Sequence, residues 1–297
     1  MLLFFPAIPL IHILETSVKI IDFRVRPPLK RILNAVMYTN GERRDRFTRQ
    51  VGLEPAPSAQ QLSMPMLLEE MKAAGVVMGV ITGRVSDFLG SVPNDDVTAI
   101  IKEYPGLFCG MAAVDPTNRK AAIKGIDDAM AAGFRGVTIE PGAYPVPLYA
   151  DDRKLYPIYA HLEDRNIPTI IMTGGNAGPD LSYSSPIAVD RVAGDFPNLR
   201  IVISHGNWPW VSEILHVAFR RSNVYISPDM YLHNMPGMDD YLKAANGFLA
   251  DRFIYASAYP LVPLKDYADW FKKLPLSPEA MQKCVYGNAA KLLGINP

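Results

Sequence analysis

Two arginines stand two residues apart where a short apolar run ends. Arg24 and Arg26 close the segment KIIDFRVR, before Pro27. Residues i and i+2 of a strand point to the same face, so both guanidinium groups are expected on one side. Two buried positive charges need anionic partners. Two readings stay open: structural ion pairs with carboxylates such as Glu140, Asp229 or Asp115, or a bidentate grip on a carboxylate or phosphate of a substrate.

His205 is the first candidate for moving a proton. It follows the apolar run RIVIS and precedes Gly206. Its titration range suits a general acid or base, and capping of the next helix is the alternative role. Glu140 and Asp229 also follow apolar runs and are candidate catalytic carboxylates. A salt bridge to an arginine is the alternative for Glu140, and a turn after Pro228 is the alternative for Asp229.

Four other residues are candidates for contacting a substrate. They stand at or just beyond the ends of apolar runs, and they are Met172, Tyr144, Trp208 and Tyr259. Buried tyrosines pack more commonly than they transfer protons, so packing is the alternative for both tyrosines. Trp208, in the segment NWPW, would wall a pocket or contact another subunit.

The elements that must position these residues are short apolar runs separated by helical patterns. Near-continuous apolar strands are typical of a parallel sheet that is buried on both faces. Eight strands alternating with helices over 297 residues predict a single-domain α/β protein with the (β/α)8 barrel fold. The runs are 17–24, 76–82, 107–114, 135–140, 168–173, 200–205, 223–228 and 252–257. The helix candidates are 62–74, 123–132, 157–165, 210–221 and 238–249.

A doubly wound open sheet is the alternative, but it would normally carry a Gly-rich phosphate turn after its first strand, and FRVRPPLKR has none. In a barrel, the carboxyl ends of the strands meet at one face, which is where active sites lie. The candidates above should therefore gather there. Residues 27–58 interrupt the regular spacing and are expected to form a long loop over this face, as a lid or a partner contact. The barrel should span residues 17–297, and residues 1–16 an N-terminal extension.

Composition excludes several classes of protein. Thirty basic residues balance thirty acidic ones, so binding to nucleic acid or to an anionic membrane is not expected. The apolar stretch of about 14 residues at the N-terminus is too short to span a bilayer. Two cysteines, Cys109 and Cys284, are too few for a disulfide framework or a zinc cluster. They predict buried thiols in a reducing, cytoplasmic compartment.

Several segments, in order, resemble the amidohydrolase superfamily, in its decarboxylase-like barrel branch. They include KIIDFRVRP, AAVDP, GFRGVTIEPG, IPTIIMTGG, FPNLRIVISHGNWPWV, NVYISPD, DRFIYASAYPLVPL and YGNAAKLLGI, across about residues 17–295. The resemblance implies metal ligands at several strand ends: His-x-His after strand one, a histidine after strand five and an aspartate after strand eight. This chain has Arg24 and Arg26, Met172 and Ala258 at those places, and His205 alone matches the pattern.

These departures predict an enzyme with no catalytic metal and no other cofactor, because guanidinium groups have no lone pair to donate. We expect hydrolysis of a lactone or another activated acyl bond in a small carboxylated cyclic or aromatic compound. Arg24 and Arg26 would stabilise negative charge, and His205 would move the proton. A metal-free decarboxylase, or another lyase or isomerase on a similar substrate, is the first alternative. A non-catalytic ligand-binding barrel is the second, and we expect a homodimer.

Overall fold

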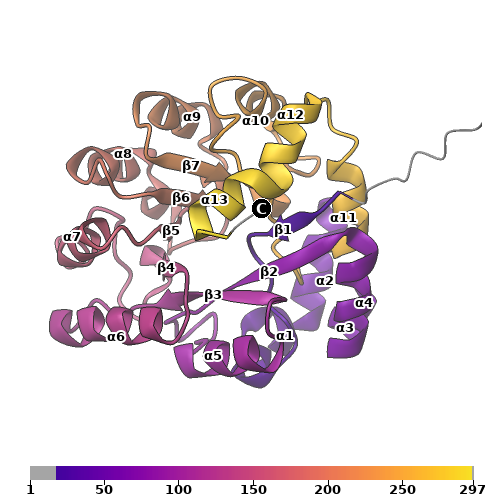
Figure 1. Ribbon diagram of the computed structural model, residues 1–297, viewed down its shortest axis with the longest axis horizontal. Coiled ribbons are helices and arrows are strands. Elements are labelled where there is room, and N and C mark those ends of the chain that lie inside the picture. The colour runs from indigo at the N-terminus through magenta and orange to yellow at the C-terminus, as the bar shows by residue number, and fades with distance from the viewer. Residues whose placement is uncertain (1–17, 296–297) are drawn as a thin grey trace, which may run out of the picture.

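The computed structural model describes residues 18–295, which form a barrel of parallel strands surrounded by helices (Figure 1). The seven regular strands pair in chain order from β1 to β7. The sequence-based prediction of a single-domain (β/α)8 barrel is confirmed. The strands are β1 (Ile20–Asp22), β2 (Val76–Thr82), β3 (Phe108–Ala113), β4 (Gly136–Ile139), β5 (Thr169–Met172), β6 (Ile201–Ser204) and β7 (Val224–Ser227).

A helix follows each strand and covers the outside of the barrel (Figure 1). These helices are α4 (Met64–Ala74), α5 (Asn94–Glu103), α6 (Arg119–Ala131), α7 (Tyr156–Asp164), α8 (Pro186–Asp195), α9 (Val211–Arg220), α10 (Met238–Ala245) and α11 (Leu264–Phe271). The five predicted helices are all present. Helix α6 begins four residues before its predicted start, because the Asn118 side chain accepts a hydrogen bond from Ala121 N and caps the first turn.

The eighth strand, predicted over 252–257, is not a regular strand. This segment makes an isolated parallel bridge between Phe253 and Ile226, and Phe23 N donates to Tyr255 O at 3.1 Å. It therefore fills the gap between β7 and β1 with few ladder hydrogen bonds. The closure between β7 and β1 therefore depends on side-chain contacts as well as on backbone hydrogen bonds. Strand β1 is also shorter than the predicted run 17–24.

Apolar side chains fill two layers. One lies between the strands and the helices, and the other lies inside the barrel around Phe23, Met111 and Ile170. The inner layer continues into α13 (Asn288–Leu293), which follows α12 (Pro278–Gln282) and a π-helical turn, Lys283–Gly287. Arg200, just before β6, donates to Leu292 O at 3.0 Å. Helix α13 thus closes the amino end of the barrel and leaves the carboxyl end for a site (Figure 1).

Residues 27–58, predicted as a long loop, are largely helical. They contain a 3₁₀ helix, Lys30–Asn34, followed by α1 (Val36–Thr39), α2 (Gly41–Gln50) and α3 (Pro57–Gln60). The expectation of a loop is therefore wrong for most of this segment. Pro57 occupies the first turn of α3, where proline is tolerated. Asn40 caps α2 by accepting a hydrogen bond from Arg43 N at 2.9 Å.

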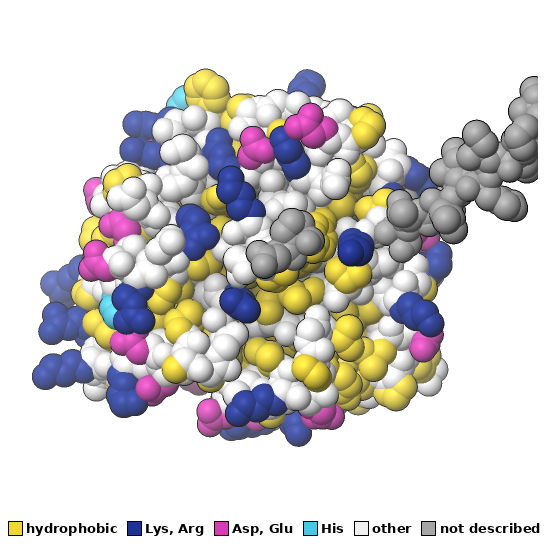
Figure 2. Space-filling model, in the orientation of Figure 1, with side chains coloured by type: hydrophobic (Ala, Val, Ile, Leu, Met, Phe, Trp, Pro, Cys, Tyr) yellow, Lys and Arg dark blue, Asp and Glu magenta, His cyan; other side chains and the backbone are white. Residues whose placement is uncertain are grey.

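The surface on the α13 side has no single-signed charge patch. Figure 2 shows Lys and Arg side chains spread around this face among Asp and Glu, with apolar side chains near α13. Within residues 18–295, no helix is both long and apolar enough to cross a membrane. Cys109 and Cys284 are free, buried thiols, as predicted. The predicted extension 1–16 lies outside the described residues.

Asp22 ties the two edges of the barrel together at its closure. Its Oδ1 accepts hydrogen bonds from Ser257 N at 2.9 Å and from Arg24 N at 3.1 Å. Burial raises the pKa of this carboxyl from its ordinary value of 3.8 to about 7, although hydrogen bonds to Ser257 and Arg24 oppose the shift. The neutral form is therefore the one that the fold favours.

We expect Asp22→Ala to destabilise the protein by about 2–4 kcal/mol at pH 6, because two buried N–H groups lose their acceptor. Asp22→Asn keeps that acceptor and should cost much less. Because its folded pKa is raised, Asp22 stabilises the fold most fully below about pH 4, and this contribution is lost as the pH rises through about 7. Wild type should accordingly lose stability relative to Asp22→Asn over that range. Urea unfolding at several pH values measures both effects, and equal stability of the two variants at pH 6 would contradict the assignment.

Candidate active site

A cavity lies at the carboxyl end of the barrel, between the strand ends and the helical segment 27–58. Its volume is about 100 Å³. A cavity needs roughly 10–15 Å³ to hold one water molecule. A cavity of this volume therefore suits a small compound with a single ring. Polar residues from the barrel line its inner part, and residues of α1 and α2 line its outer part. The lining includes Arg24, Arg84, Glu140, Met172, Asn176, His205, Tyr231, Met37, Arg43, Arg44 and Phe47.

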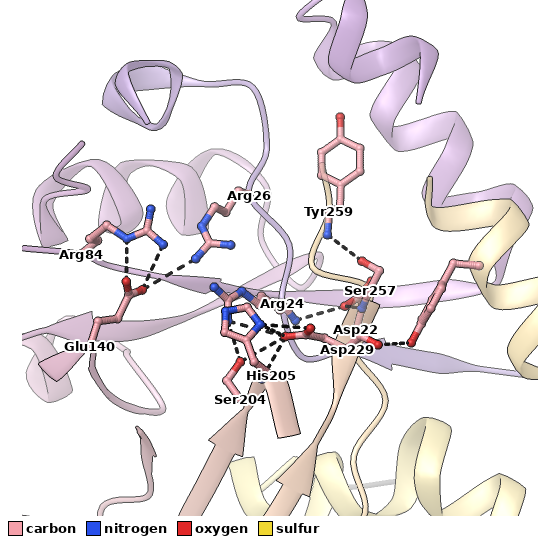
Figure 3. Close-up of polar contacts among 11 residues, drawn as sticks. Asp22, Arg24, Arg26, Arg84, Glu140, Ser204, His205, Asp229, Ser257 and Tyr259 are labelled. Carbon is pink, nitrogen blue, oxygen red and sulfur yellow. Dashed lines mark hydrogen bonds and ion pairs between the residues drawn. The ribbon is translucent and has the colours of Figure 1, made fainter. Parts of the chain in front are cut away.

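His205 stands directly after β6 and is held by Asp229, which follows β7 (Figure 3). Its Nδ1 lies 2.9 and 3.1 Å from the two oxygens of the Asp229 carboxylate, and its backbone N donates to Asp229 at 3.2 Å. Both residues have a positive φ, +63° for His205 and +48° for Asp229. Such backbone is costly for residues other than glycine and persists where the surroundings enforce it, most notably at functional sites.

The contact with Asp229 sets the protonation of His205. A carboxylate accepts hydrogen bonds, so Nδ1 carries the proton and Nε2 is left as the basic nitrogen of a residue that lines the cavity. Burial lowers the pKa of His205, while Asp229 opposes this shift and Arg24 adds to it. The imidazole is therefore neutral at pH 7, with Asp229 fixing its tautomer and Tyr231 packed edge-on against its ring at 5.0 Å.

Arg24 shares Asp229 with His205. Its Nη1 donates to Ser204 Oγ at 2.6 Å and lies 3.7 Å from Asp229 Oδ2. The guanidinium is almost wholly buried and lines the cavity. A positive charge is thus fixed beside a neutral, basic imidazole.

Glu140 is held in a second cluster by two arginines (Figure 3). Arg84 donates to both oxygens of Glu140, at 2.8 and 3.2 Å, and Arg26 Nη2 lies 3.8 Å from Oε1. Burial alone would raise the pKa of Glu140, but Arg84, Arg26 and Arg24 outweigh it and lower this pKa. Glu140 is therefore a poor base. Asp115, the other predicted partner, bonds to Thr117 at a separate turn.

Positive charge exceeds negative charge in this interior. Three buried arginines, Arg24, Arg26 and Arg84, share the carboxylates of Glu140 and Asp229. Within residues 18–295, all three guanidinium nitrogens of Arg26, Nε of Arg24 and Nη1 of Arg84 lack a hydrogen-bond partner. Buried donors normally have acceptors, so this region is suited to an anionic group.

The predicted site residues separate into three groups. Arg24, Glu140, Met172 and His205 line the cavity, whereas Arg26 and Asp229 lie behind it and contact these residues. The structure does not place the remaining three on the cavity: Tyr144, Trp208 and Tyr259.

Each of these three aromatic residues has its polar atom engaged elsewhere. Tyr144 Oη donates to Val114 O at 3.0 Å, Trp208 Nε1 donates to Pro236 O at 3.2 Å, and Tyr259 Oη lies 2.8 Å from Ser58 Oγ. Trp208 also stacks on the outside of Tyr231, with ring centroids 5.4 Å apart. All three thus pack away from this cavity, because position at a strand end does not fix side-chain direction, and their contact with a substrate stays a prediction.

Several lining residues are not among the predicted site residues. Arg84 stands two residues after β2, a strand-end position like those of the predicted residues, and Tyr231 follows Asp229 by two residues. The residues of α1 and α2, such as Met37, Arg43 and Phe47, gave no such signal. They reach the cavity because the segment 27–58 folds back over the strand ends.

The donor set does not fit a divalent cation. Such an ion needs several lone pairs from imidazole or carboxylate groups. Arg24, Arg84 and Met172 occupy much of the barrel side of the cavity, and Glu140 is engaged by Arg84. In the part of the chain that the structure describes, no three His, Cys, Asp or Glu residues form a group that could hold a metal ion.

Two solved structures of low identity share this fold. A 2,6-dihydroxybenzoate decarboxylase from Rhizobium has 14% identity and a TM-score of 0.73, over 94% of this chain and 99% of that one. A dihydroxybenzoic acid decarboxylase from Polaromonas, with bound manganese and the inhibitor 2-nitroresorcinol, has 16% identity and a TM-score of 0.66, over 95% and 98%. No curated protein matches the sequence.

A third structure is far more similar. It is an uncharacterized TIM-barrel protein from Bordetella bronchiseptica with 54% identity and a TM-score of 0.91, over 93% of this chain and 98% of that chain. The sequence model of the amidohydrolase family, described as Amidohydrolase, matches residues 21–295, nearly the whole barrel. The matched residues form a closed barrel whose polar residues gather at its carboxyl end. Because the family model matches nearly the whole of this barrel, the chain belongs to the amidohydrolase family.

Proposed function

We propose that this protein is a metal-independent hydrolase that cleaves a lactone or another activated acyl bond in a small carboxylated ring compound. One observation carries the proposal: Asp229 holds Nδ1 of a neutral His205, which lines the cavity beside the buried cation Arg24. A neutral imidazole is a base, and a fixed cation stabilises negative charge that develops on a reacting oxygen.

The step needs one water molecule and one proton carrier. Nε2 of His205 takes a proton from the water as its oxygen attacks the acyl carbon, and Arg24 stabilises the resulting oxyanion. The ring carbon–oxygen bond then breaks, and the proton on Nε2 passes to the leaving oxygen. The products are an enol or alcohol and a carboxylic acid, so one water is added overall, and the acid then releases its proton to solvent to become a carboxylate. Asp229 stabilises the imidazolium while it carries the proton.

A carboxylated substrate follows from the charge of the interior. The three arginines around Glu140 and Asp229 leave an excess of positive charge at the inner part of the cavity. Activated acyl compounds such as lactones suit this site because unactivated amides generally need a stronger nucleophile, such as a metal-bound hydroxide.

Decarboxylation is the second candidate, and the decarboxylase names of two structural relatives favour it. Replacing carbon dioxide by hydrogen requires a proton donor, and the lowered pKa of His205 leaves its Nε2 unprotonated at pH 7, while the proton on Nδ1 is held by Asp229. This favours hydrolysis. A ligand-binding barrel without turnover is the third candidate.

The reaction class can be tested with a panel of five- and six-membered lactones bearing a ring carboxylate, beside a panel of hydroxybenzoates. In water enriched in oxygen-18, hydrolysis places the label in the new carboxylate, whereas decarboxylation releases carbon dioxide. We expect label incorporation with wild type and roughly 10²–10⁴-fold slower turnover with His205→Asn. Turnover of hydroxybenzoates alone would favour decarboxylation, and turnover of neither panel would contradict both enzymatic proposals.

The pH profile with the lactone that is turned over tests the role of His205 as a base. kcat/KM should fall as the pH drops through the pKa of His205, which burial places below 6.5. Asp229→Asn removes the charge that raises this pKa, so the acid limb should move to lower pH. Arg24→Met removes a charge that lowers it, so the limb should move to higher pH. If neither substitution moves the acid limb, the limb reports the titration of a group other than His205.

Metal content tests the cofactor proposal directly. Purified protein should hold only a substoichiometric amount of zinc, manganese, iron or cobalt by elemental analysis. Chelator should change neither its melting temperature nor its turnover, because arginines occupy the positions where a cation would need lone pairs. Loss of activity on chelation, with recovery on adding one of these metals, would refute it.

A further inference from the structure

Tyr231 differs from most buried tyrosines of this barrel in the use of its hydroxyl group. Within residues 18–295, no oxygen accepts a hydrogen bond from the Tyr231 hydroxyl, and Tyr231 lines the cavity. Buried hydroxyl groups normally donate to an acceptor. Four other tyrosines follow this rule and donate to backbone carbonyls: Tyr144 to Val114 at 3.0 Å, Tyr159 to Ala150 at 2.8 Å, Tyr241 to Gly206 at 2.7 Å and Tyr267 to Asp229 at 2.6 Å.

Packing on three sides fixes the position of this hydroxyl. Tyr231 lies in the 3₁₀ helix Asp229–Leu232, directly after the carboxylate that holds His205. Its ring packs edge-on against the imidazole, with centroids 5.0 Å apart, and stacks on Trp208 at 5.4 Å. The phenol oxygen lies against Gly175, which has φ +60° and where a Cβ would overlap it. Glycine at this position therefore leaves the room that the hydroxyl occupies.

The hydroxyl of Tyr231 is a neutral donor. Burial raises its pKa to about 12, although Arg24, Arg43 and a hydrogen bond from the backbone N–H of Asn176 oppose this shift. The phenol therefore keeps its proton at neutral pH. Because the backbone N–H already donates to the phenol oxygen, the hydroxyl proton is the part of the group that remains to be donated.

The cavity brings this donor together with the proposed base and cation. His205, Arg24 and Tyr231 all line it. Arg24 donates to Ser204 through Nη1, and its Nε lacks a partner in the part of the chain that the structure describes. Sites that stabilise an oxyanion present donors fixed in advance where the negative charge develops. A cation and a fixed neutral hydroxyl beside a basic imidazole are such a set.

We propose that Tyr231 is a further catalytic residue, whose hydroxyl donates a hydrogen bond to the oxyanion that forms when water attacks the acyl carbon. This inference rests on the proposed function, in which Arg24 alone was assigned to this oxyanion. The proton stays on Tyr231 throughout. Its hydrogen bond strengthens as the acyl oxygen becomes negative and weakens when the ring carbon–oxygen bond breaks, while His205 remains the proton carrier.

Kinetics of Tyr231→Phe test this role, with the carboxylated lactone that wild type hydrolyses fastest. We expect kcat to fall about 10²-fold, the scale of removing one oxyanion donor. KM should change little, because the lost hydrogen bond is strong only in the transition state. The acid limb of the pH profile should stay in place, since phenylalanine keeps the ring that packs against His205.

Tyr149→Phe is the matched control, because it removes the same hydroxyl from another tyrosine. Tyr149 is exposed, its Oη lies 3.1 Å from Ser182 Oγ, and it does not line the cavity. This variant should keep the kcat of wild type. Melting temperatures of both variants should stay close to that of wild type.

Binding of a six-membered cyclic phosphonate that bears a ring carboxylate provides a second measurement. Its tetrahedral, anionic phosphorus centre resembles the oxyanion formed from a lactone, and such analogues bind through the interactions made in the transition state. By calorimetry, Tyr231→Phe should bind it at least 10-fold more weakly than wild type, the scale of one charge-assisted hydrogen bond. Tyr149→Phe should bind it as wild type does.

The outcomes separate this inference from the proposed function. If wild type hydrolyses the lactone and Tyr231→Phe keeps its kcat, or only raises KM, Tyr231 is not an oxyanion donor, while the roles of His205 and Arg24 stand. Unchanged affinity for the phosphonate would overturn the role of Tyr231 in the same way. An equal loss of kcat in Tyr149→Phe would also overturn it, because the effect would not be specific to the cavity. If wild type hydrolyses no lactone, both proposals are contradicted.

Discussion

The buried arginines of the barrel interior are the constraint on which the rest of the site depends. Arg24, Arg26 and Arg84 are buried just beyond the ends of β1 and β2, and a guanidinium group stays protonated even when it is buried. The cost of burying three cations is reduced only where acceptors are placed around them. Glu140 and Asp229 are therefore held in position by these arginines, and the lowered pKa of Glu140 explains why Glu140 is not free to serve as the proton carrier.

The same constraint shapes His205. Asp229 lies between Arg24 and the imidazole, so one carboxylate orients both groups. The carboxylate favours protonation of His205, whereas burial and the nearby arginine disfavour it. Burial thus keeps the imidazole neutral, and one shared carboxylate orients both this imidazole and the adjacent cation. The positive φ of His205 and Asp229 persists because the surrounding structure enforces it.

The segment 27–58 completes the cavity from outside the barrel. Its helices bring Met37, Arg43 and Phe47 over the strand ends. Arg44 joins α2 to α3, since it pairs with Asp45 and donates to Ala59 O at 3.1 Å.

The sequence by itself determined the barrel, its strand order and the set of polar residues at the strand ends, because apolar runs of strand length recur at regular spacing. It also determined that His205, Arg24 and Glu140 would meet, since the carboxyl ends of parallel strands share one face. Only the tertiary structure decided which carboxylate pairs with which arginine, and that Tyr144, Trp208 and Tyr259 point away from the cavity. It also decided that the segment 27–58 is helical and supplies the outer wall. These features depend on side-chain directions and on contacts between residues distant in sequence, such as Tyr259 with Ser58, which local patterns do not encode.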